Sequence, residues 1–258
     1  MIARLVPEAA LADGDRRSIS GAGVKTRNFV LRALCDADAQ ALAVDLRDVE
    51  LESGDVLYEP DYPVEWVYFP QTAVVSGVTV MADGRTVESE TVGCESAMGV
   101  LAALGSSPST NRTFTQIPGA ATRLSASKLR HRADASADFR RLLVRHSLAN
   151  LAQAQQSVAC NALHGVNQRL CRWLLMSQDR TAKDVVELTH QYLATMVGVQ
   201  RTTITGALRD LAKAKLIGIG RARIEILDRS GLEAQVCECY GAVRSNLERL
   251  IGDAPTAG

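Results

Sequence analysis

The sequence predicts an α+β fold with an antiparallel β-roll, a long helix and a winged helix-turn-helix, in that order. Apolar and polar residues alternate between turn signals from Val49 to Leu124, as in short strands. The apolar spacing becomes helical from Ser125 to Leu163. A helix, turn and helix pattern starts at Thr189 and ends in alternating residues around Gly218 and Gly220, which indicate a small hairpin.

The length and composition fit one large domain or two modest ones. The chain has 258 residues, of which 47% are hydrophobic and 22% charged, so a disordered, collagen-like or disulfide-stapled chain is excluded. The longest charge-free run, His146 to Gln168, is too polar for a bilayer core. The N-terminus has no apolar core followed by a cleavage site, so we expect a cytoplasmic protein with no membrane partner. Six scattered cysteines are expected to be buried thiols.

The formal net charge of +0 conceals two regions of opposite sign. The segment from Asp48 to Val100 has eleven acidic residues and one basic residue. The segment from Arg169 to Arg229 has eleven basic and six acidic residues. This asymmetry predicts two domains, of which the basic one is a candidate for binding a polyanion. The acidic domain would repel the polyanion, and this repulsion would help to turn the basic domain towards it.

The pattern divides the chain into four parts: a flexible tail over residues 1–27, a roll over 28–135, a long helix over 136–164, and a winged helix-turn-helix with a C-terminal helix over 165–258. A short helix is expected at Asp36 to Leu46. The strand region contains the turn signals Ser53-Gly54-Asp55, Asp83-Gly84 and Pro118-Gly119, and the Asp-Gly pair between alternating runs predicts a hairpin.

The long helix should have about seven turns, with two overlapping apolar stripes joined by uncharged polar residues. One stripe suits packing on the roll, and the other suits a seam between two copies of the chain. A helix buried in the core of one monomer is the alternative. The apolar positions are Leu142, Val144, Leu148, Leu151, Val158 and Leu163.

The segment from Leu188 to Leu211 has the spacing of a helix-turn-helix. Ala194 stands four residues before Gly198, and Ile204 stands six after it. The small Ala lets two helices cross closely, and the Gly suits the turn between them. Thr189 can cap the first helix. The second helix would then enter a DNA major groove with its N-terminal turn.

We expect the side chains of that turn and of the hairpin to contact DNA. Arg201 is suited to bind a guanine edge through two hydrogen bonds, while Thr202 and Thr205 can touch a thymine methyl group or a phosphate. Arg221 and Arg223 would hold the backbone from the wing. A solvated surface charge is the alternative for any single arginine. The predicted set is Thr189, Gln191, Gln200, Arg201, Thr202, Thr203, Thr205, Arg209, Arg221 and Arg223.

This order of elements resembles the Crp/Fnr superfamily of bacterial transcription regulators, over roughly Asn28 to Asp228. The most specific stretch is LTHQYLATMVGVQRTTITGALRDLAKAKLI, preceded by NQRLCRWLLM. The resemblance implies a cyclic-nucleotide-binding-like sensor roll, a homodimer, a two-fold symmetric double-stranded DNA site and contact with RNA polymerase. Arg201 matches the family arginine that recognises guanine. Thr202 and Gly206 replace the usual Glu and second Arg, so a different half-site is expected.

The resemblance is weaker at the positions that hold cyclic nucleotides in this family. Gly93-Cys94-Glu95 approximates the ribose-binding pair, Arg112-Thr113 corresponds to the phosphate-binding pair, and Ala154-Gln155 replaces the purine-binding pair. No cofactor is assigned, a small-molecule effector is left open, and a cyclic nucleotide is not the favoured effector. A cyclic AMP or cyclic GMP response is the alternative. The candidate effector residues are Gly93, Glu95, Arg112, Thr113 and Gln155.

Other chemistry is not favoured. Only Cys35 lies where an iron–sulfur sensor would have several cysteines, and no His precedes residue 131 to hold a haem in the roll. A thiol switch is left open. Without a nucleophile elbow or phosphate loop, catalysis is not expected. A redox or metal-dependent enzyme remains as an alternative, and it would use Glu95, His146, or Cys237 and Cys239.

No metal site is expected from the cysteines or histidines. Cys237 and Cys239 fall in an expected helix from Gly231 to Ile251, where residues two apart point in nearly opposite directions, so they would serve packing. The histidines lack ligand spacing and are expected at interfaces or on the surface. They are His131, His146, His164 and His190.

Overall fold

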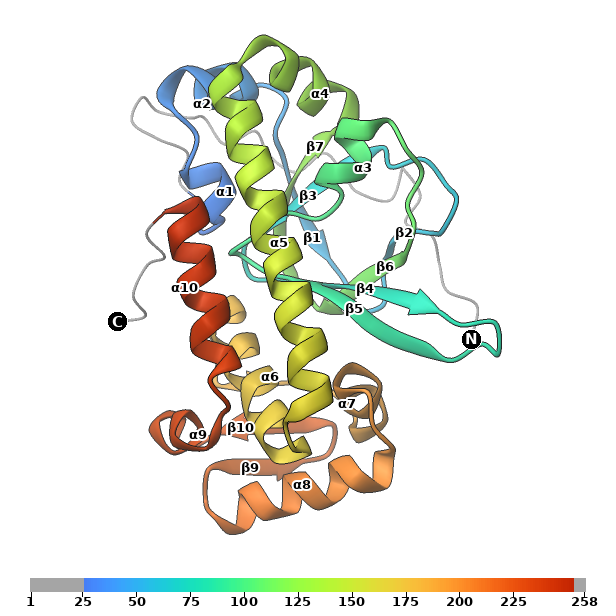
Figure 1. Cartoon of the computed structure of the whole chain (residues 1–258), viewed down its shortest axis with the longest axis vertical. Coiled ribbons are helices and arrows are strands. Elements are labelled where there is room, and N and C mark those ends of the chain that lie inside the picture. Colours follow the sequence, from blue (N-terminus) through green and yellow to red (C-terminus); the bar gives the residue numbers. More distant parts are fainter. Residues whose placement is uncertain (1–25, 253–258) are drawn as a thin grey trace.

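The computed structural model describes residues 26–252 and contains a β-roll, a long helix and a winged helix-turn-helix unit (Figure 1). The predicted α+β fold is therefore confirmed. Residues 1–25 of the expected N-terminal tail and residues 253–258 lie outside the described residues. Within residues 26–252, no helix is both long and apolar enough to cross a membrane.

Two short helices precede the roll. The first, α1 (Phe29–Arg32), begins at Asn28, whose side-chain oxygen accepts hydrogen bonds from the amides of Val30 and Leu31. The amide nitrogen of the same side chain donates to the carbonyls of Pro70 and Ser96 at 3.0 and 2.7 Å, which fastens α1 to the roll. The second, α2 (Asp36–Ala43), lies where a helix was predicted but ends three residues earlier.

Seven strands form the roll as two antiparallel sheets. One sheet has the order β1-β7-β3 and the other the order β2-β6-β4-β5. The Asp83-Gly84 pair joins β4 to β5, which confirms the predicted hairpin, whereas Pro118 leads the chain from one sheet to the other. The strands are β1 (Arg47–Leu51), β2 (Val56–Tyr58), β3 (Trp66–Pro70), β4 (Val74–Val80), β5 (Thr86–Val92), β6 (Arg112–Ile117) and β7 (Gly119–Ser125).

The stretch with helical spacing from Ser125 to Leu163 forms two helices. After α3 (Val100–Gly105), which lies between β5 and β6, the chain forms α4 (Ala126–Ala135) and α5 (Ala137–Leu163). The long helix predicted over residues 136–164 agrees with α5, which begins where it does because Ser136 is extended and its hydroxyl accepts from the Phe139 amide at 3.2 Å. The break lets α4 and the start of α5 pack on the same core of the roll.

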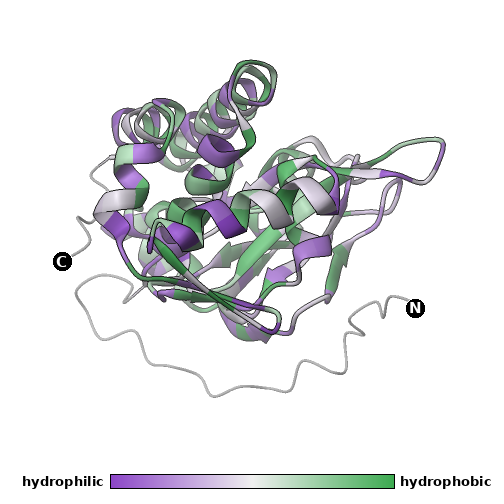
Figure 2. Cartoon of the chain, turned by 90° about the horizontal axis from the view of Figure 1, so that it is seen from below, coloured by the Kyte–Doolittle hydropathy of each residue, from purple (hydrophilic) through white to green (hydrophobic). Residues whose placement is uncertain are grey.

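The winged unit has one core. It is formed by Leu170, Leu174, Leu193, Ile204 and Leu208, all fully buried, because the helices are amphipathic with their apolar stripes turned inward. Figure 2, viewed from the end where α8 lies, shows hydrophilic and hydrophobic stretches alternating along the helices. The elements are α6 (Val166–Thr181), β8 (Val185–Val186), α7 (His190–Val197), α8 (Arg201–Lys213), β9 (Ile217–Gly220) and β10 (Arg223–Ile226).

The expected C-terminal helix from Gly231 to Ile251 is wrong as a single helix. The chain forms α9 (Arg229–Gln235) and α10 (Cys239–Ile251), with an extended Val236 between them. This break turns α10 back along α5, on the other side of α5 from the roll strands (Figure 1). Ile251 thereby enters the core that the roll shares with α5, which only a change of direction allows.

Candidate nucleic-acid interface and ligand pocket

The helix-turn-helix has the geometry that the spacing predicted. Gly198 ends α7 in the left-handed conformation, with φ of 69°, and the amide of Val199 donates to the Ala194 carbonyl at 2.9 Å. Ala194 is buried where the two helices meet, and Ile204 anchors α8 beneath them. The hydroxyl of Thr189 caps α7 by accepting from the Tyr192 amide at 3.2 Å. Local sequence therefore determines this motif.

The first turn of α8 faces away from the core. Gln200, Arg201, Thr202 and Thr203 are all exposed, and Ile204 directly behind them is fully buried. The first amides of a helix have no partner within it, so this end of α8 presents both side chains and backbone donors to a polyanion. It is the arrangement by which a recognition helix enters a major groove.

Thr205 has a different position from its predicted neighbours. It is half-buried, its hydroxyl donates to the Arg201 carbonyl at 2.9 Å, and it lies 3.2 Å from Nδ1 of His190 on α7. The hydroxyl therefore braces α7 against α8, in addition to any contact with DNA. His190 is accordingly part of the helix-turn-helix scaffold.

The wing and the flanking side chains complete the basic face. Arg221 and Arg223 are exposed in the β9–β10 hairpin, whose turn includes Ala222 at φ of 52°. Arg223 also lies 3.3 Å from Glu225 of the same strand, an exposed pair. Arg209 on α8 and Gln191 on α7 are exposed as well. Each of these side chains is thus accessible to a ligand in solution.

The winged unit is docked onto the four-stranded sheet of the roll. Tyr192 of α7 stacks edge to face on Phe114 of β6, with ring centroids 6.0 Å apart. Leu188 is buried in one cluster with Val74 and Ile117 of the roll. The two parts therefore share an apolar contact rather than a flexible linker alone.

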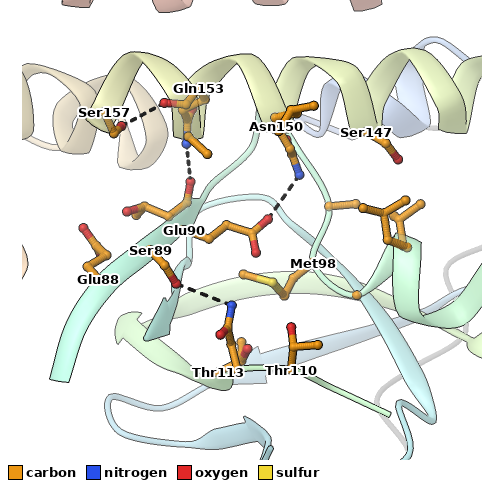
Figure 3. Close-up of a pocket in the computed structure, with 18 of the residues that line it drawn as sticks. Glu88, Ser89, Glu90, Met98, Thr110, Thr113, Ser147, Asn150, Gln153 and Ser157 are labelled. Carbon is orange, nitrogen blue, oxygen red and sulfur yellow. Dashed lines mark hydrogen bonds between the residues drawn. The ribbon is translucent and has the colours of Figure 1, made fainter. Parts of the chain in front are cut away.

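A cavity of about 530 Å³ lies where the roll, α5 and the winged unit meet. Its walls come from β5, the segment around α3, α5, α6 and the end of α7. On the α5 side, Asn150, Gln153 and Ser157 point into it, and Asn150 donates to Glu90 of β5 at 3.2 Å (Figure 3). This volume is in the range of small-molecule sites.

Two carboxylates give the pocket an unusual electrostatic character. Burial raises the pKa of Glu88, which accepts hydrogen bonds from Ser76 at 2.5 Å and from Gln116 at 3.0 Å. Burial also raises the pKa of Glu90. Part of the acidity noted in the sequence thus faces this pocket, together with Arg169, Arg172 and Arg180 of α6, so the lining carries both signs of charge.

The structure separates the residues expected to bind the effector. Only Thr113 lines the pocket. Arg112 lies 3.4 Å from Glu59 in an ion pair, and Glu95 pairs with Arg180. Gln155 is exposed and does not line the pocket. The fifth candidate, Gly93, packs against the aliphatic part of Arg180. Four of the five candidates therefore lie outside this pocket, and Arg112, the expected phosphate partner, is engaged in a salt bridge.

The pocket residues on α5 were missed, although a signal existed. His146, Asn150, Gln153 and Ser157 recur at helical spacing within the charge-free run that was noted only for its polarity. A polar stripe on an otherwise buried helix face is unusual, because buried polar groups require partners. This stripe of polar residues therefore predicts a pocket beside the long helix.

His146 is a core residue, whereas the sequence predicted a position at an interface or on the surface. Its Nε2 lies 2.7 Å from the Ser96 hydroxyl and accepts from the Ala97 amide at 3.0 Å. Burial lowers the pKa of His146 to about 4, so the ring is neutral at pH 7. Its position fastens the middle of α5 to the loop after β5.

The groups proposed for the enzyme alternative have structural partners within the described residues. Glu95 contacts Arg180, His146 contacts Ser96, and Cys237 lies at the break before α10. Of the six cysteines, Cys35 is exposed, and the other five are buried as expected.

Comparisons with known proteins agree with this architecture. The family model for the Crp-like helix-turn-helix domain matches residues 168–235. The transcriptional regulator SdrP of Thermus thermophilus is 30% identical over 108 residues, which are 40% of this chain and 53% of SdrP. The chain thus spans about half the length of that curated relative.

Two solved structures share the fold over most of their length. FixK2 from Bradyrhizobium japonicum is 20% identical with a TM-score of 0.63, over 74% of this chain and 98% of that chain. TTHA1359, a Crp/Fnr-family transcriptional regulator from Thermus thermophilus, is 22% identical with a TM-score of 0.60, over 73% and 97%.

The fold and the site together define a class: proteins in which a β-roll and a winged helix-turn-helix are joined by a long helix. Within this class, the chain contains a Crp-like helix-turn-helix domain at residues 168–235 and shares its fold with a solved Crp/Fnr-family regulator.

Proposed function

We propose that the protein is a homodimeric, sequence-specific DNA-binding transcription regulator that acts in the cytoplasm. The observation that carries this proposal is the exposed first turn of α8, with Arg201 at its start, within a Crp-like domain. The basic wing supplies contacts to the phosphate backbone. Contact with RNA polymerase belongs to the same proposal, by similarity to the regulators that share the fold.

A seam on α5 supports the dimer. Val144, Leu148, Leu151 and Val158 are 51%, 49%, 54% and 71% exposed, which is costly for large apolar side chains unless a partner covers them. With Gln155 they recur every three or four residues, as in a coiled coil. The polar pocket stripe occupies a neighbouring face of the helix, and Leu151 borders both, so the rest of the seam is free for a second copy.

Two parallel α5 helices would place two α8 helices on the same side of the dimer. Two-fold symmetry then requires a palindromic site, with half-sites about one helical turn apart. We therefore expect the protein to bind a symmetric DNA sequence.

The pocket supports a small-molecule effector. A ligand there would touch β5 of the roll, α5, and the helices α6 and α7 at once. Such a ligand can favour one placement of the winged unit over another, because it binds the two placements with different affinity. Glu88 and Glu90 can accept hydrogen bonds from a ligand, and Arg169, Arg172 and Arg180 of α6 line the same pocket, so a ligand with both donor and acceptor groups suits it. The expected phosphate partner of a cyclic nucleotide, Arg112, is paired with Glu59 instead.

Selection of bound sites from random double-stranded DNA by the purified protein tests the proposed function. We expect a palindrome with half-sites about one helical turn apart. Failure to enrich any sequence, both alone and with cellular small-molecule extract, would contradict it. Calorimetry with cyclic AMP and cyclic GMP tests the effector class, and micromolar binding of either would overturn our preference for another ligand.

A further inference from the structure

Four side chains that are distant in sequence meet at the lower end of α5. The sulfurs of Cys160, Cys237 and Cys239 and a ring nitrogen of His164 all lie within 4.8 Å of one another. The Cys160 and Cys237 sulfurs are 3.6 Å apart, and the Cys239 sulfur is 3.5 Å from Nδ1 of His164. The three thiols are buried, with exposed fractions of 0%, 3% and 1%.

The breaks in the helices create this cluster. Cys160 is in the last turn of α5 and His164 ends that helix four residues later, so both lie on one face. Cys237 precedes α10 and Cys239 begins it, which removes the objection that two residues apart on a helix point away from each other. The break between α9 and α10, which the sequence did not predict, brings the sulfurs of Cys237 and Cys239 to the same point.

The distances fit a single tetrahedral ion. With Zn–S of about 2.3 Å and Zn–N of about 2.0 Å, tetrahedral angles give S–S edges of about 3.8 Å and S–N edges of about 3.5 Å. Two of the six edges, at 3.6 and 3.5 Å, match these values, and the other four, all within 4.8 Å, would shorten on binding. Three thiolates and one imidazole are soft and borderline ligands of the kind that zinc prefers in closed sites.

The surroundings also suit a metal. Nε2 of His164, the nitrogen opposite the proposed ligand atom, lies 3.3 Å from the carboxylate of Glu238, as in carboxylate–histidine–metal arrangements. The side-chain amide of Gln156 donates to the Cys239 sulfur at 3.0 Å. Arg172, only 8% exposed, donates to Ser157 on the same part of α5 and offers positive charge to a trithiolate site.

We propose that Cys160, His164, Cys237 and Cys239 form a structural Zn²⁺ site that fastens α10 to the end of α5. On binding, each of the three thiols releases its proton to solvent and donates a sulfur electron pair, with no redox change. The protein fills all four positions, so the ion has no open position for a substrate. The ligands flank the domain at residues 168–235 on both sides, so the ion fixes how that domain leaves α5.

Metal analysis of the full-length protein, purified with its thiols reduced, tests this site. We expect one zinc per chain in the wild type, and loss of zinc in Cys237→Ser and Cys239→Ser. Cys35→Ser and Cys171→Ser are the matched controls, one exposed and one buried outside the cluster, and both should keep the ion. Zinc retained at wild-type stoichiometry in both cluster variants would overturn the proposal.

A second measurement needs no variant. Chelation of the wild type should lower its Tm by roughly 10 °C, and Zn²⁺ but not Mg²⁺ should restore it. Co²⁺ should give the absorption bands of a tetrahedral thiolate site. A reduced protein that binds neither zinc nor cobalt would contradict the site, as would a Cys160–Cys237 disulfide found by mass spectrometry in protein isolated anaerobically. Neither result depends on DNA binding.

Discussion

The guanidinium of Arg180, in the last turn of α6, forms an ion pair with the carboxylate of Glu95 at 2.7 Å, and this pair joins the winged unit to the roll. The two side chains are 5% and 13% exposed. Arg180 also donates to the Thr91 carbonyl at 3.0 Å. Because a buried charge requires its partner, this ion pair fixes the position of the winged unit on the roll.

Replacement of Glu95 by Gln should destabilise the protein by about 3 kcal/mol, because it leaves the buried guanidinium of Arg180 without a counter-charge. Urea unfolding measures the change in stability. We expect the unfolding curve of the variant to show a separate transition of the winged unit at lower urea concentration. The exposed pair of Asp83 and Arg85 provides the control, and Asp83→Asn should change stability by less than about 0.5 kcal/mol. Equal effects of the two substitutions would contradict a structural role for the buried pair.

Arg201 and Arg223 should affect DNA binding in different ways. Arg201→Ala should lower affinity for the selected site by about 1–3 kcal/mol and relax one base position, because a guanine contact is lost. Arg223→Ala should weaken all sequences alike and reduce the salt dependence, because a phosphate contact is lost. Binding isotherms on specific and random DNA at several salt concentrations separate the two. Equal losses on both DNAs for Arg201→Ala would refute its assignment to a base.

Leu151→Glu should raise the dimer dissociation constant by about 100-fold or more, because it places a charge in the α5 seam of both copies. Sedimentation equilibrium measures this constant. Val87→Glu is the control, since Val87 is also an exposed aliphatic residue, 45% exposed, but lies on β5. If Leu151→Glu stays as dimeric as the control, the seam lies elsewhere.

Stability should fall as the pH decreases from about 6.5 towards 4, through His146. Its pKa is about 4 in the folded protein, so between these values the unfolded chain binds a proton that the native state does not. The effect reaches roughly 3 kcal/mol at its limit. Glu88 and Glu90, with raised pKa values, act in the opposite direction.

The difference between the wild type and His146→Gln isolates the histidine. Urea unfolding at pH 7.5, 6 and 5 should give a smaller loss of stability in the variant than in the wild type. The exposed His131 provides the control, and His131→Gln should keep the wild-type dependence. If the stability of His146→Gln depends on pH as steeply as that of the wild type, then the ring of His146 is not buried in its neutral form.

The elements that were predicted correctly depend on residues close together in the chain. Ala194, Gly198 and Ile204 span eleven residues and determine the helix-turn-helix by steric fit and burial alone. Asp83-Gly84 determines a hairpin in the same way. The exposed face of α8 follows from the same local pattern, since the burial of Ile204 directs its neighbours outward. The sequence by itself therefore determined the fold class and the candidate DNA interface.

Only the tertiary structure decided the pocket, the contact between the two parts and the metal cluster. Glu95 and Arg180 are 85 residues apart, and Cys160 and Cys237 are 77 apart. No local pattern specifies such pairs, because they depend on where helices break and turn. The break at Val236 places α10 along α5, and this packing converts two cysteines of an apparently continuous helix into neighbours of His164.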